Sequence, residues 1–80
     1  MGSVGPRLCE VFWNAGWRRI AIGPGYVLAE DPQGHERMIL VSCEAVTEVN
    51  HRGGMSALWT APCTRETRLE VLREKLAVAS

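Results

Sequence analysis

The sequence has zero formal net charge, no regular cysteine spacing and no long apolar run, and each of these absences argues against a class of protein. Nine Lys and Arg residues balance nine Asp and Glu residues, so the formal net charge is zero. A dedicated DNA- or RNA-binding protein would carry a basic excess, which makes nucleic acid a less favoured partner. No apolar run approaches the roughly 18 residues that a transmembrane helix requires. We therefore expect no interaction with a membrane.

The three cysteines, Cys9, Cys43 and Cys63, are odd in number and widely spaced. Such a set is a poor disulfide framework and favours reduced thiols in a cytoplasmic protein. The first residues lack the basic segment and apolar core of a signal peptide. We expect residues 1–6 to form a disordered lead-in and the protein to be cytoplasmic.

Motifs for metal binding and catalysis are missing as well. His35, Cys43, His51 and Cys63 are the candidate ligands, but no pair has the local spacing with which two ligands share one ion. A Cys–His catalytic pair would need an orienting third group and a pocket of about 300 Å³ or more, which so short a chain rarely has. The sequence predicts no metal, no cofactor and no enzymatic activity.

The chain does contain short apolar segments separated by turn signals. Asp31-Pro32-Gln33-Gly34 is a typical turn, and the polar residues 51–54 separate two β-branched runs as in a hairpin. Cys9, Val11 and Trp13 would share one face of a strand and are all apolar, whereas the other face includes Glu10, which predicts an N-terminal strand with the first face inward. The predicted strands are residues 7–13, 17–22, 26–30, 35–42, 46–50 and 55–60.

The hydrophobic period changes after Pro62. Leu69, Leu72, Leu76 and Ala79 recur three or four residues apart, which predicts an amphipathic helix over residues 65–78 that starts near Thr64 or Thr67. The predicted fold class is α+β: a bent antiparallel sheet of five or six short strands with one C-terminal helix packed across it. Residues 7–80 would form a single domain.

The spacing of Ile39, Val41, Val46 and Val49, followed by a turn, a strand and a helix, resembles the small flagellar FlbD-type family. The resemblance covers the second half of the chain and rests on apolar spacing. It implies a small non-enzymatic accessory protein with a ββα unit and carries over no functional residue. The sequence departs from the family at residues 61–63, which shorten the last strand.

Tryptophan and arginine, which are enriched at binding hot spots, gather around one predicted loop. The candidate partner-binding residues are Trp13, Trp17, Arg18, Arg19 and Trp59. The alternative for each tryptophan is a place in the core, because a small domain needs large side chains to fill it.

We expect a non-enzymatic protein-binding module that forms a homodimer. In kind it resembles the small phage-encoded anti-CRISPR inhibitors, which implies a host defence complex, such as a CRISPR effector, as the protein partner. The alternatives are a nucleic-acid-binding regulator that uses Arg18, Arg19, Arg37 and Arg52 with stacking from Trp or Tyr26, or a structural subunit of a flagellar or phage assembly.

Overall fold

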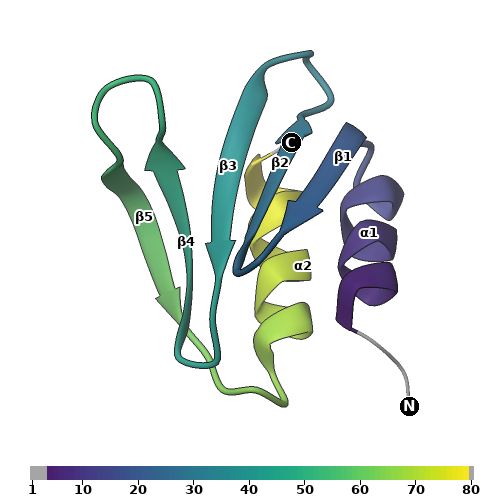
Figure 1. Cartoon of the computed structure of the whole chain (residues 1–80). Helices are drawn as coiled ribbons and strands as arrows, with labels where there is room; N and C mark the ends of the chain where they lie inside the picture. The colour runs from purple at the N-terminus through teal and green to yellow at the C-terminus, as the bar shows by residue number, and fades with distance from the viewer. Residues whose placement is uncertain (1–3, 80) are drawn as a thin grey trace.

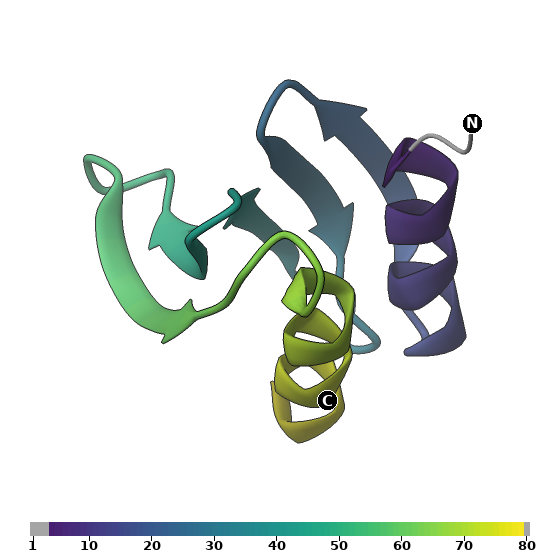
Figure 2. The ribbon, with the colours of Figure 1, turned by 90° about the horizontal axis from the view of Figure 1, so that it is seen from below.

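The computed structural model describes residues 4–79 of the 80-residue chain. In chain order the elements are α1 (Val4–Asn14), β1 (Arg18–Gly23), β2 (Tyr26–Glu30), β3 (Glu36–Val41), β4 (Ala45–Asn50), β5 (Ser56–Pro62) and α2 (Arg68–Ala79). Within these residues the strands form one antiparallel meander in the order β1-β2-β3-β4-β5, so the sheet is open and has two edges. Figure 1 and Figure 2 show that the sheet curls around α2, with α1 next to α2 and β1. The predicted α+β class is confirmed, with a second helix added at the N-terminus.

The prediction of a strand at residues 7–13 is wrong, because this segment lies in α1. Leu8, Val11 and Phe12 are buried, whereas Cys9 and Trp13, which were expected to face inward, are exposed. The apolar residues therefore follow the 3.6-residue period of a helix, and Val11 fits both periods. Residues 4–6 also belong to α1 and are not a lead-in, while residues 1–3 lie outside the described part of the chain.

A Schellman motif ends α1 where the sequence predicted a hairpin loop. The N–H of Trp17 donates to the carbonyl of Phe12 at 3.0 Å, and the N–H of Gly16 donates to the carbonyl of Trp13 at 3.0 Å. Gly16 has φ +90°, the left-handed conformation that this helix end requires. The accompanying apolar contact is the edge-to-face pair of Phe12 and Trp17, with ring centroids 5.2 Å apart. The motif therefore sends Trp17 into the core.

The other predicted strands agree with the observed ones to within two residues at each end. The C-terminal helix begins at Arg68, three residues later than expected, because Thr64 and Thr67 first form a turn of their own. Each of these threonines accepts a hydrogen bond from the backbone N–H of the other, at 3.2 and 2.9 Å. This reciprocal pair is of the capping-box type, with Thr64 at the N-cap, and the N–H of Val71 then donates to the carbonyl of Thr67 at 2.9 Å where α2 begins.

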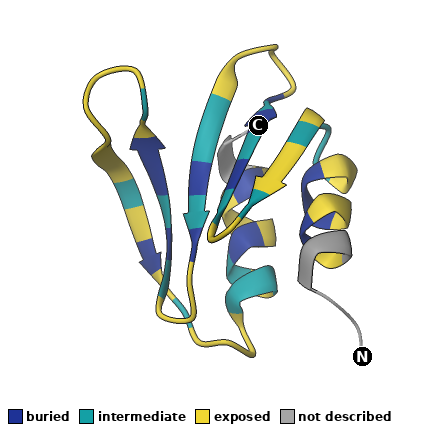
Figure 3. Cartoon of the chain, viewed as in Figure 1, coloured by how far each residue is buried: buried dark blue, intermediate teal, exposed yellow. Residues whose placement is uncertain are grey.

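The core lies between the inner face of the sheet and the two helices. On the strands, buried residues alternate with more exposed ones, as in Val27 and Ala29 of β2 (Figure 3). Leu72 and Leu76 of α2 are fully buried against this face, as their spacing predicts. In the described part of the chain neither helix is long and apolar enough to cross a membrane.

The Leu72 side chain should carry much of the stability of the fold. We expect Leu72→Ala to lower the free energy of unfolding by about 2–4 kcal/mol, because the deletion leaves a cavity in the core. The matched control is Glu74→Ala on the exposed side of the same helix, which should change stability by less than about 0.5 kcal/mol. Urea unfolding followed by circular dichroism measures both variants. Equal small effects would show that α2 is not anchored in the core.

Candidate functional site

Polar side chains occupy the inner face of the sheet at one end, on four neighbouring segments. Arg37 lies two residues before buried Ile39 on β3, and Glu48 lies two residues after buried Val46 on β4. Because side chains alternate along a strand, both charged groups point to the helix side of the sheet. Trp59 of β5 is the direct register partner of Glu48.

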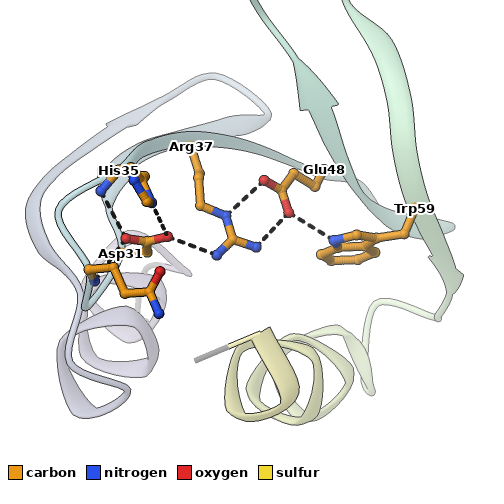
Figure 4. A network of polar contacts seen from close by, with 6 residues as sticks. Asp31, His35, Arg37, Glu48 and Trp59 are labelled. Carbon is orange, nitrogen blue, oxygen red and sulfur yellow. Dashed lines mark hydrogen bonds and ion pairs between the residues drawn. The ribbon is translucent and has the colours of Figure 1, made fainter.

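These residues form one hydrogen-bonded cluster, here called the Arg37 network: Asp31, Arg37, Glu48 and Trp59. Arg37 donates from Nε and Nη2 to the two carboxylate oxygens of Glu48, each at 2.8 Å. Its Nη1 donates to Oδ2 of Asp31 at 3.1 Å. The indole N–H of Trp59 donates to Oε1 of Glu48 at 2.8 Å (Figure 4). The network thereby links β3, β4, β5 and the turn after β2.

The turn after β2 fixes Asp31 through its own backbone. The N–H groups of Gln33 and His35 both donate to Oδ1 of Asp31 at 2.9 Å. This leaves Oδ2 for Arg37, with Nδ1 of His35 at 3.8 Å. The Asp31-Pro32-Gln33-Gly34 turn therefore also positions a buried carboxylate.

The hydrogen bonds of the network outweigh the effect of burial on its two carboxyl groups. Burial raises the pKa of Asp31 and is the largest influence, but hydrogen bonds from His35, Arg37 and Gln33 together bring that pKa below its ordinary value. Burial likewise raises the pKa of Glu48, and hydrogen bonds from Arg37 and Trp59 with the Arg37 charge lower it overall. The hydrogen bond to Glu48 in turn raises the pKa of Arg37. At neutral pH both carboxylates are ionised and have no proton to donate.

An open groove of about 640 Å³ lies over the network. Besides the network residues, Gln33, His35, Leu58 and Lys75 line it. The ammonium of Lys75 lies 5.7 Å from the centre of the Trp59 ring. The guanidinium carbon of Arg37 lies 4.8 Å from the centre of the Trp17 ring. Of the charged groups that line the groove, Asp31, Arg37 and Glu48 are already bonded to one another.

A second cluster, here called the Trp13 corner, consists of Trp13, Arg18 and Arg19. Trp13 is 53 % exposed, and the guanidinium carbon of Arg18 stacks 3.6 Å from its ring centre. Nη1 of Arg18 donates to the carbonyls of Trp13 at 3.1 Å and Trp17 at 2.7 Å, so the stacked pair is held in place. Arg19 projects outward beside it, with 80 % of its side chain exposed and a contact of 3.5 Å to Glu30.

The structure separates the five predicted partner-binding residues into three environments. Trp13, Arg18 and Arg19 share the exposed corner. Trp17 is fully buried, so its placement on a binding surface was wrong; the Schellman motif turns it into the core. Trp59 is half-buried in the groove on the opposite edge strand.

Sequence reasoning missed the Arg37 network. Its signal was a set of opposite charges at inward positions of neighbouring strands, Arg37 two residues from Ile39 and Glu48 two residues from Val46. The candidate metal ligands do not assemble: in the described residues no three His, Cys, Asp or Glu side chains are grouped so that they could hold a metal ion. Cys9, Cys43 and Cys63 are free thiols.

The network predicts how stability depends on pH. Because the folded pKa values of Asp31 and Glu48 lie below their ordinary values of 3.8 and 4.5, the unfolded chain binds more protons at acid pH. The stabilisation is present above about pH 4.5 and is lost as the pH falls through and below these values. We expect Glu48→Gln to cost about 1–3 kcal/mol at neutral pH and to lose less stability on acidification than the wild type.

Urea unfolding from neutral pH to below 3.8 measures this difference. Glu74→Gln, on the exposed side of α2, is the control and should follow the wild-type curve. Parallel pH curves for Glu48→Gln and the wild type would show that the ion pair contributes no pH-dependent stability.

Comparison with known proteins gives no match, neither to a protein family, nor to a curated protein, nor to a solved structure. The resemblance to the FlbD-type family therefore stays a prediction. The two clusters of the chain, the Arg37 network and the Trp13 corner, are therefore the evidence on its function.

Proposed function

We propose that the protein is a non-enzymatic module that binds another protein by surface contact through the Trp13 corner. The observation that carries this proposal is the exposed Trp13 ring with the Arg18 guanidinium stacked on it at 3.6 Å. Tryptophan and arginine are the residue types that dominate binding hot spots. The two hydrogen bonds from Arg18 to backbone carbonyls fix the pair before binding, so little side-chain entropy remains to be lost.

The shape of the chain around the corner also favours contact with a partner. Trp13 lies on the side of α1 away from the core residues Leu8 and Phe12, so its burial is not needed for folding. Arg19 has φ +54° at an irregularity between Arg18 and Ala21 of β1, and this bulge directs its side chain to solvent. The corner thus presents one aromatic ring and two cations at the surface.

The two carboxylates in the groove are poorly suited to acid–base catalysis. General acid–base chemistry needs a group whose pKa lies near the working pH. Asp31 and Glu48 have lowered pKa values, and both carboxylates are hydrogen-bonded to Arg37. Surface binding accounts for the features of the chain better than acid–base catalysis does.

Nucleic-acid binding receives less support than protein binding. Of the four arginines considered for it, Arg37 is committed to Asp31 and Glu48, with 18 % of its side chain exposed. Arg52 follows β4, three strands away from Arg18 and Arg19 on β1. These arginines do not form the continuous basic surface that would follow a phosphate backbone.

For the partner we propose a protein complex of the bacterial cytoplasm, where three free thiols are stable. A host defence complex of the CRISPR effector type is the first candidate to test, following the resemblance in kind to small phage-encoded inhibitors. A flagellar or phage assembly is the second.

The Trp13 corner should be separable from folding. We expect Trp13→Ala and Arg19→Ala to leave the thermal midpoint nearly unchanged and to weaken partner binding by about 1–3 kcal/mol each. Arg18→Ala is a poorer test, because Arg18 also bonds the end of α1. Capture from bacterial lysate on immobilised protein, followed by titration with the purified partner, measures the effect.

Arg52→Ala is the matched control for Arg19→Ala, since Arg52 is an exposed arginine that follows β4, three strands away from the corner. A partner held equally by the wild type, Trp13→Ala and Arg19→Ala would contradict the proposal. A steep, log-linear loss of binding with salt would point to nucleic acid instead.

A further inference from the structure

The two edges of the open sheet are built differently. Edge strand β1 carries Arg18 and Arg19, contains the bulge with φ +54° at Arg19, and has α1 packed beside it. Charges, bulges and covering helices are the devices that block unwanted strand pairing. Edge strand β5 has β4 on one side and no described element on the other (Figure 1). It also contains an irregularity, at Leu58, and a proline at position 62, so the difference from β1 lies in the missing charge and the missing helix.

The β5 edge has no charge to protect it. From Gly53 to Thr64 the sequence contains no charged residue. Two of the large exposed apolar side chains lie here, Met55 at 51 % and Leu58 at 58 %. An uncharged edge strand with exposed apolar residues is a template for pairing with another strand.

The free hydrogen-bonding groups of β5 lie in its second half. The register with β4 is regular from Trp59 to Pro62, and the irregularity is at Leu58. The N–H of Cys63 donates across the ladder to the carbonyl of Glu44 at 2.9 Å. Because every second residue of an antiparallel ladder faces the partner strand, the backbone of Thr60 faces the open side. Pro62, which has no N–H, sits at an equivalent outward position.

We infer that β5 is a self-association edge, through which two copies of this chain pair antiparallel about Thr60. In this arrangement the N–H and C=O of Thr60 bond those of Thr60 in the other copy, and Leu58 lies opposite Pro62. Trp59 lies beside Ala61 of the other copy, on the same face of the sheet as the groove. The pairing covers exposed apolar surface and closes the uncharged, uncovered edge.

A second copy of the chain fits this edge because pairing about a two-fold axis brings the uncharged β5 strand of one copy against the same strand of the other. Across β5 that arrangement opposes no like charges, and two chains with zero formal net charge do not repel each other. The same pairing at β1 would bring Arg19 of one copy close to Arg19 of the other, and these like charges would repel each other. The Trp13 corner lies at the β1 end of the sheet, so pairing at β5 leaves both corners of the dimer free.

Light scattering and sedimentation equilibrium of the full chain test this inference. The wild type should have twice the chain mass of 8.8 kDa at micromolar concentration. Thr60→Pro removes the outward N–H and should be monomeric, whereas Thr60→Val retains it and should stay dimeric. The valine variant also controls for the hydroxyl bond of Thr60 to Thr47, 3.2 Å long, which both variants lose.

Leu58→Lys provides a second test that leaves the backbone of β5 intact. Because Leu58 lies opposite Pro62 of the other copy, the lysine replaces an apolar contact with a charge on the pairing edge and should raise the dissociation constant of the dimer about ten-fold or more. Ala21→Lys places the same charge on an exposed position of β1 and should have no effect.

A wild type of 8.8 kDa at all concentrations would overturn the inference. It would also be overturned if Leu58→Lys remained dimeric, or if Ala21→Lys dissociated the dimer. Partner capture through the Trp13 corner is measured separately, so either proposal can fail without the other.

Discussion

The bidentate ion pair between Arg37 and Glu48 is the interaction on which the far half of the sheet depends. The helices cover the inner face with Leu8, Phe12, Leu72 and Leu76, and the network occupies the face beyond them. Arg37 stacks over Trp17, so the network continues the apolar core. A lone charge at either position would be costly, and the pair is tolerable because Asp31 and Trp59 satisfy most of its remaining bonding capacity.

This use of charged groups inside the fold has a consequence for function. The side chains that look most reactive in a sequence, the buried acids and Arg37, are occupied in holding β3, β4 and β5 together. The Trp13 corner at one end of the sheet and the uncharged edge of β5 at the other are not part of this network. We propose that the chain contacts other molecules at these two ends.

Much of the fold was predictable because Gly, Pro and Asp mark its turns and the strands alternate, as at residues 26–30. The stripe containing Leu72 and Leu76 gave the C-terminal helix. The N-terminal helix was missed because a segment of seven residues, 7–13, with apolar side chains at both odd and even positions, is too short to distinguish the two periods. In addition, Gly16 was interpreted as a hairpin residue, whereas it ends a helix. Trp13 and Trp17 are the same residue type on either side of one short segment, and only the position of the helix end determines that Trp13 is exposed and Trp17 is buried. The Arg37 network was missed because its partners come from strands whose order the sequence does not state.

A double-mutant cycle on Arg37 and Glu48 tests most directly whether their pairing is the constraint that we describe. Arg37→Met, Glu48→Gln and the double variant would be compared by urea unfolding at neutral pH. We expect the two losses not to be additive and the coupling free energy to be about 1–3 kcal/mol, as for groups in direct contact. Additive losses, with a coupling below about 0.3 kcal/mol, would mean that the two side chains act independently and would contradict the account.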